Sequence, residues 1–98
     1  MAKPQAKRWT FGNVALVAAF RPKTLDARRT IGMLTDRTPE AVRIKDMNLD
    51  AARGKKQKYG KTGSKLEPLI VQLEKKHPKL FGEIVDVILA AAWMGHDV

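Results

Sequence analysis

The stretch TLDARRTIGMLTDRTPEAVRIKDMNL, from Thr24 to Leu49, decides how the chain folds. Its first half carries apolar residues at helical spacing, namely Leu25, Ala27, Ile31 and Leu34. A short polar break over residues 35–37 follows. Thr38 then supplies an N-cap hydroxyl, and Pro39 stands at the first helical position, where its missing N–H costs nothing. The stretch therefore predicts two helices joined by a tight turn.

The second of these helices has a narrow apolar face made by Ala41, Val42 and Leu49. The side chains expected to point outward are polar or charged: Glu40, Arg43, Lys45 and Asn48. A short capped helix that rests on a neighbour and presents cations and amides is typical of a helix-turn-helix that reads DNA. An ordinary helical hairpin with a solvated charged face fits the same residues, and this stretch alone does not decide between the two.

Charge is distributed unevenly along the 98 residues, whose formal net charge is +9. Residues 1–65 hold sixteen Lys and Arg against five Asp and Glu, whereas residues 66–98 hold three against five. A strongly basic part beside a mildly acidic one indicates a polyanion-binding region joined to a part with another role. A charge that merely keeps the protein soluble would not explain the asymmetry.

Composition favours one small helical domain, because Ala, Leu, Lys and Arg are abundant and 44% of residues are hydrophobic. The chain has no cysteine, which excludes disulfides and thiolate metal sites. The N-terminus lacks the apolar core of a signal peptide, and the longest apolar run, residues 87–94, is too short to span a bilayer. We therefore expect a soluble, cytoplasmic protein, associated with the nucleoid.

Residues 1–8 form a basic arm that contains Lys3, Lys7 and Arg8. Thr10 can cap a first helix, whose apolar residues extend to Phe20, and Trp9 is expected to pack beneath it. This helix should end at Arg21-Pro22, because the residue before a proline avoids the helical region.

A resemblance rests on four elements: Trp9-Thr10, Ala15-Leu16, Ile31-Gly32-x-Leu34 and Arg37-Thr38-Pro39-x-Ala41-Val42-Arg43-x-Lys45. Together they resemble the Myb/SANT-like three-helix domain over residues 8–50, and most closely its bacterial and phage variants. The Arg-Thr-Pro-x-Ala-Val-Arg element is the most specific. Three features depart from the family pattern: Trp9 is alone, Thr35-Asp36 replaces Leu-Gly, and Asp46 stands where an apolar or aromatic residue is usual.

The resemblance implies a helix-turn-helix whose third helix, here residues 38–53, enters the major groove of DNA. The positions that match the family's groove-facing helix, together with the outward-pointing Asn48, give the base-reading candidates. These are Arg43, Ile44, Met47, Glu40, Lys45 and Asn48. We expect phosphate contacts from the arm, the turn and the following linker: Lys7, Arg8, Arg37, Thr38, Arg53, Lys55, Lys56, Lys58 and Lys61.

Residues 54–65 are predicted to be a flexible cationic linker, because they are rich in lysine and glycine and contain no acid. Gly54 is expected to end the preceding helix. Tyr59 lies among the lysines, where its ring could stack on a base. A solvated tether is the alternative interpretation of this segment.

Residues 66–98 are predicted to form a helical hairpin. Ser64 and Glu67 have capping-box spacing, and His77-Pro78 breaks the pattern into two helices. The second helix is apolar on nearly all sides between residues 80 and 94, so it must be buried either on the N-terminal domain or against another chain. We favour a homodimer, with an interface formed by Leu69, Leu73, Phe81, Ile84, Val85, Ile88, Leu89 and Trp93.

No catalytic or metal-binding motif is recognisable, so we expect neither an enzyme nor a cofactor. The expected fold is all-α: a three-helix helix-turn-helix domain over residues 9–53 and the C-terminal hairpin. The expected function is sequence-specific binding of double-stranded DNA, as a small transcriptional regulator or a phage or plasmid accessory factor. Two alternatives stay open: a non-specific architectural or RNA-binding protein, and a protein-interaction module that grips its partner through the C-terminal helices.

Overall fold

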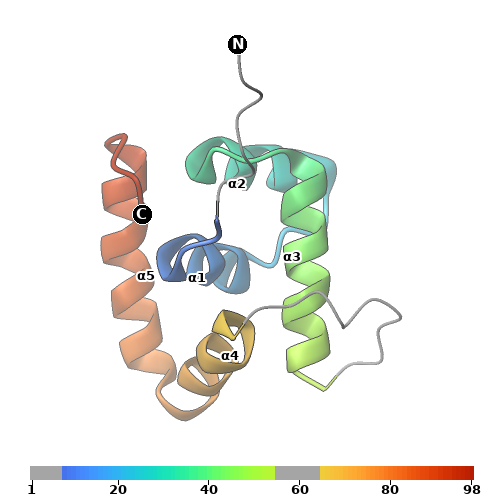
Figure 1. The fold of residues 1–98 in the computed structure, drawn as a ribbon. Coiled ribbons are helices and arrows are strands. Elements are labelled where there is room, and N and C mark those ends of the chain that lie inside the picture. The colour runs from blue at the N-terminus through green and yellow to red at the C-terminus, as the bar shows by residue number, and fades with distance from the viewer. Residues whose placement is uncertain (1–7, 55–64) are drawn as a thin grey trace.

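The computed structural model of the chain describes residues 8–54 and 65–98, which form five α-helices and no strand. The helices are α1 (Phe11–Phe20), α2 (Leu25–Thr35), α3 (Pro39–Ala52), α4 (Leu66–Lys76) and α5 (Pro78–Trp93). In Figure 1, α3 and α5 lie on opposite sides of α1, with α2 above and α4 below. The all-α class is confirmed. None of the helices in the described part of the chain is long and apolar enough to cross a membrane.

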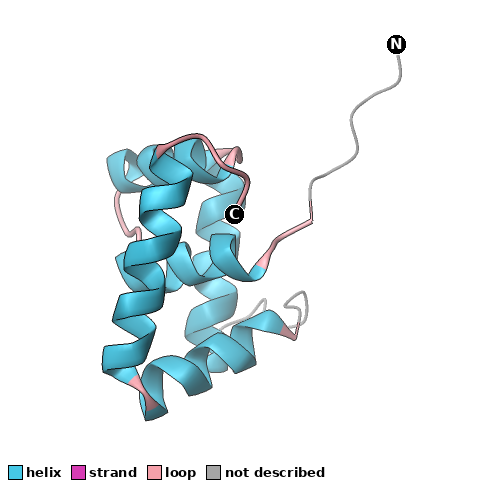
Figure 2. Ribbon diagram, turned by 90° about the vertical axis from the view of Figure 1, so that its left-hand side faces the viewer, coloured by secondary structure: helices cyan, strands magenta, loops and turns pink. Residues whose placement is uncertain are grey.

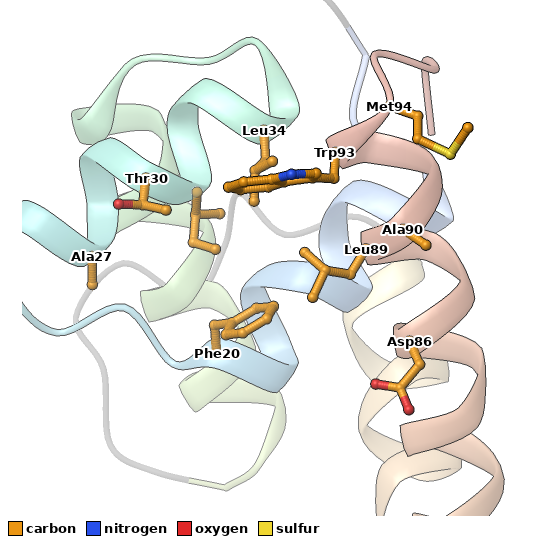
Figure 3. A pocket seen from close by; sticks show the side chains of 10 residues that line it. Phe20, Ala27, Thr30, Leu34, Asp86, Leu89, Ala90, Trp93 and Met94 are labelled. Atoms are coloured by element: carbon orange, nitrogen blue, oxygen red, sulfur yellow. The ribbon is translucent and has the colours of Figure 1, made fainter.

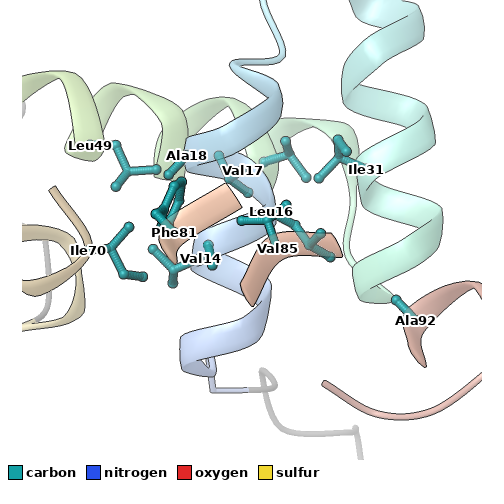
Figure 4. Packing of buried hydrophobic residues seen from close by; sticks show 12 residues of the cluster. Val14, Leu16, Val17, Ala18, Ile31, Leu49, Ile70, Phe81, Val85 and Ala92 are labelled. Carbon is teal, nitrogen blue, oxygen red and sulfur yellow. The ribbon is translucent and has the colours of Figure 1, made fainter. Parts of the chain in front are cut away.

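Helix α1 lies at the centre of the fold and contacts each of the other four helices. Five consecutive residues, Val14 to Ala18, are completely buried (Figure 4). Five consecutive residues cover the whole circumference of a helix, so α1 must be surrounded by protein on every side. The core built on it also includes Ile31, Leu49 and Ile70, and thereby joins helices from both halves of the chain.

Helix α5 differs from the expectation that it is buried on all sides. It stands at the edge of the molecule (Figures 1 and 2), with Phe81, Val85 and Ala92 in the core. Val87 and Trp93 are each 71% exposed. Since α1 occupies the central position and α4 also packs on it, only one face of α5 finds a place in the core.

The helix ends follow the local sequence. The hydroxyls of Thr10, Thr24 and Thr38 each accept a hydrogen bond, 3.1 Å long, from the N–H three residues ahead. The predicted caps Thr10 and Thr38 are therefore confirmed, as is Pro39 at the start of α3. Gly54 follows α3 with a φ of +90°, and α5 begins at Pro78, immediately after His77.

The turn between α2 and α3 folds closely over the end of α2. Asp36 adopts the left-handed conformation, and the N–H of Arg37 donates to the carbonyl oxygen of Gly32 at 2.8 Å. A Cβ on Gly32 would lie 2.5 Å from the carbonyl oxygen of Arg37, so the position requires glycine. Asp36 stands here where the family pattern has glycine, and aspartate is one of the residues that tolerate this conformation.

The C-terminal helices fold back onto their own chain, which is one of the two arrangements that the sequence left open. Both α4 and α5 pack against α1. The capping box predicted for α4 is not described in full, because Ser64 lies outside the described residues. Glu67 is buried, and its carboxylate accepts a hydrogen bond from Lys45 on α3. The burial of α4 and α5 thus does not require a second chain, and the homodimer stays a prediction.

Candidate nucleic-acid interface

One face of α3 is open to solvent, and four of the six base-reading candidates lie on it. Glu40 and Ile44 are exposed and Arg43 and Met47 are half-buried; we call these four residues the exposed α3 face. Their spacing of three, four and seven residues places them on one stripe of the helix. The guanidinium of Arg43 donates to both carboxylate oxygens of Glu40, at 2.6 and 2.7 Å, and its Nη1 lies 3.2 Å from the sulfur of Met47. The hydrogen bond from Arg43 holds the pKa of Glu40 below its ordinary value.

The other two base-reading candidates, Lys45 and Asn48, do not point outward as expected. Lys45 is 6% exposed, and its Nζ lies 2.8 Å from Oε1 of Glu67 and 5.1 Å from the ring centre of Trp9. Asn48 is also buried. For Lys45 the reason is that α4 packs on α3 and brings the buried carboxylate of Glu67 to its ammonium group. We therefore leave both residues out of the interface.

The unusual Asp46 of the sequence faces inward, where it has a cationic partner. It is 2% exposed, and its Oδ2 lies 2.6 Å from Nζ of Lys23, which also reaches Asp50 at 2.8 Å. Partial burial alone would lower the pKa of Lys23, but the hydrogen bonds to these two carboxylates outweigh it and raise the pKa. An ion pair thus occupies the position where Myb/SANT-like domains usually have an apolar or aromatic residue. The expected inner positions of α3, Val42 and Leu49, are buried.

Arg53 is not placed as the predicted phosphate ligand. Its guanidinium donates to Asp50 at 3.1 Å, to Glu74 on α4 at 3.3 Å and to the carbonyl oxygen of Ala18 at 3.1 Å. Because these groups already hold a largely buried guanidinium, Arg53 ties α3 to α1 and α4. We leave it out of the interface.

At the N-terminal end of α3, Arg37 contacts Arg8, the last residue of the basic arm, and Trp9, which follows it. Its guanidinium donates to the carbonyl oxygens of Thr35 and Arg8, each at 2.6 Å, and lies 4.1 Å from the ring centre of Trp9. Partial burial lowers the pKa of Arg37. Arg8 is exposed, as is the capping residue Thr38. The basic arm therefore joins the fold beside the start of α3.

Two basic segments join the described structure near the two ends of α3. Residues 1–7, with Lys3 and Lys7, precede Arg8; residues 55–64, with Lys55, Lys56, Lys58 and Lys61, follow Gly54. These phosphate candidates lie outside the described residues, so their predicted role rests on the sequence. The helix between the two attachment points has 14 residues and is about 21 Å long. The described residues at which these two segments join the fold, Arg8 and Gly54, thus lie near opposite ends of α3.

Sequence reasoning missed Arg28 as a member of this surface. Its charge is close enough to Glu40 to contribute to the lowered pKa of that carboxyl group, and its Nε donates to the carbonyl oxygen of Pro22 at 3.1 Å. The neighbouring Arg29 is exposed and lies 4.0 Å from Asp26. Two consecutive arginines, on the polar side of the helix predicted to begin after Thr24, were the signal that could have found them.

The predicted oligomerisation residues divide into three groups by burial. Phe81 and Val85 belong to the chain's own core, and we withdraw them from any interface between chains. Leu73, Ile84, Ile88 and Leu89 are partly buried. Leu69 and Trp93 are exposed. The exposed apolar surface at the C-terminal end is accordingly smaller than the sequence indicated.

No protein-family model, no curated protein and no solved structure matches this chain. The resemblance to Myb/SANT-like domains thus stays a prediction.

Proposed function

We propose that this chain binds double-stranded DNA through the exposed α3 face, with phosphate contacts from the basic segments at both ends of α3. The proposal rests on the points at which the two basic segments join the fold, near the two ends of α3. Arg37 and Trp9 fix the chain beside the start of α3, and the lysine-rich segment follows its last turn. The side chains of such a helix can enter a groove of DNA while the basic segments at its two ends contact phosphates. This arrangement suits a duplex, because phosphates border each groove on both sides.

The side chains on this face and beside it would have different roles. Arg43 can form a bidentate contact with a guanine edge, once it leaves Glu40. Ile44 and Met47 offer apolar surface, which suits the methyl group of thymine. Arg28 and Arg8 supply further charge to phosphates. A base-reading role for Arg43 makes the proposal one of sequence-specific binding.

Competition between DNA duplexes tests the proposal. Bound sequences are first selected from random duplex DNA, and the preferred duplex is labelled for fluorescence anisotropy. A base-reading protein keeps the labelled duplex in the presence of excess unrelated DNA. Equal displacement by preferred and unrelated duplexes would replace the proposal by non-specific nucleic-acid binding. Absence of binding at moderate salt would leave a protein-interaction module as the function.

A further inference from the structure

An open apolar groove lies between α2, α5 and the end of α1, away from the exposed α3 face. Its volume is about 690 Å³. Two helical stripes form its walls, and Phe20 contributes at the end of α1. Figure 3 shows the indole of Trp93 reaching from α5 toward Leu34 on α2, with Asp86 further along α5. This groove plays no part in the proposed binding of DNA.

The polar groups of the groove are few. Of its lining residues, only Thr30 and Asp86 carry a polar side chain other than the indole of Trp93. The hydroxyl of Thr30 already donates to the carbonyl oxygen of Asp26 at 3.0 Å. The exposed carboxylate of Asp86 forms no hydrogen bond or salt bridge with the described part of the chain. The groove thus offers one negative charge on an otherwise apolar and aromatic surface.

The dimensions of the groove suit a small molecule. Its volume lies within the range of about 300–1,000 Å³ that is typical of small-molecule sites. Asp86 and Trp93 are two helical turns apart, or about 10 Å along α5. A stable contact between proteins buries at least about 1,000 Å², and a groove two turns long supplies only part of that area. The segments outside the described residues do not suit it either, because Met1 and Tyr59 are their only large apolar side chains.

We propose that the groove binds an amphiphilic organic cation: an amine or ammonium group joined to an aromatic or alkyl body about 10 Å long. The body would lie against Leu89 and the Trp93 indole, and the cation would approach the carboxylate of Asp86. Aromatic faces attract cations as well as apolar groups, so both parts of such a ligand find a complementary surface. This inference is independent of the proposed binding of DNA.

The test uses the full chain and two probes of equal length, 4-phenylbutylammonium and the neutral 4-phenylbutan-1-ol. Binding is followed through the indole N–H resonance of Trp93 in NMR spectra, with the resonance of Trp9 as an internal reference. For ligands of this size we expect dissociation constants of about 1 mM. An exposed charge pair should make the ammonium compound bind about three- to fivefold more tightly than the alcohol. Asp86→Asn should remove this preference, whereas Glu83→Gln, outside the groove on α5, should keep it.

A second variant tests the location of the site. Ala90 is exposed and lines the groove, so Ala90→Phe should fill the space without disturbing the core, and should weaken both probes at least tenfold. An unchanged Trp93 resonance in the wild-type titration, or full binding by Ala90→Phe, would overturn the site. Equal affinity for the two probes would overturn the cationic class. A Trp93 resonance that shifts with protein concentration alone would identify the groove as a contact between copies, and would also overturn the proposal.

Discussion

Arg43 and Glu40 form a two-pronged ion pair on the exposed α3 face, with N···O distances of 2.6 and 2.7 Å. The cation at the centre of the proposed DNA-binding surface is therefore held by an anion on the same helix. Contact with a base or a phosphate requires Arg43 to exchange this partner. Glu40 thus competes with DNA for Arg43, and its own charge repels the phosphates.

Replacing Glu40 by Gln should strengthen the binding of DNA. Removal of one exposed charge and release of Arg43 are together expected to raise affinity about two- to fivefold at pH 7. The pKa of Glu40 is lowered, so the ion pair is complete above the ordinary value of 4.5 and is lost only as the pH falls through the lowered pKa. Anisotropy titrations measure the change. Glu83→Gln on α5 is the matched control, and an equal gain there would contradict the specific role of Glu40.

Arg43→Ala tests the base contact itself. It should weaken binding of the preferred duplex by about 1–3 kcal/mol and relax selectivity at one base pair. Selection from random DNA with the variant measures this directly. Arg29→Ala, which removes an exposed cation from α2, should instead cause a small and uniform loss. If Arg43→Ala also weakened binding to all sequences equally, Arg43 would be a phosphate ligand. If binding did not change, the exposed α3 face would be excluded as the DNA-binding surface.

The buried pair of Lys45 and Glu67 should behave as a unit. Lys45→Met or Glu67→Leu alone breaks a buried pair and should lower the free energy of unfolding by about 3–5 kcal/mol. The double variant Lys45→Met/Glu67→Leu removes both charges, and it should recover most of that loss. Urea denaturation measures the three values. Additive losses in the double variant would show that the two side chains do not depend on each other.

Lys23 should stabilise the fold in a pH-dependent way. Lys23→Met leaves the buried Asp46 without its cation, which is expected to cost about 1–3 kcal/mol at pH 7. Because the pKa of Lys23 is raised, its contribution is complete below the ordinary value of 10.5 and is lost as the pH rises through the raised pKa. Urea denaturation of wild type and variant at pH 7 and above 10.5 should thus give a shrinking difference. A difference independent of pH would mean that packing, and not charge, accounts for the effect.

Local signals in the sequence were sufficient to predict where most of the helices begin or end. Thr10, Thr38, Pro39 and Pro78 act on backbone groups within one turn, so their neighbours alone determine what they do. The open side of α3 was predicted only in part. The apolar residues Val42 and Leu49 correctly predicted which side of α3 is buried. Arg43 and Ile44 lie on or near the surface, as expected.

The remaining features depend on partners that are distant in the sequence. Lys45 and Asp46 look like surface residues until Glu67 and Lys23 are brought to them by the packing of other elements. Likewise, α1 and α5 are both apolar enough for a central position, and only the arrangement of all five helices assigns it to α1. The groove beside Trp93 results from that assignment.

Salt dependence of DNA binding tests the central claim most directly. With about five phosphate contacts, the logarithm of the association constant should fall against the logarithm of salt concentration with a slope near −4 to −5. Neutralising Lys55, Lys56 and Lys58 to Gln should flatten the slope and leave the preferred sequence nearly unchanged. The matched triple variant at Lys75, Lys76 and Lys79, near the junction of α4 and α5, should keep the wild-type slope. A wild-type slope near zero, or equal flattening in the two triple variants, would contradict the account.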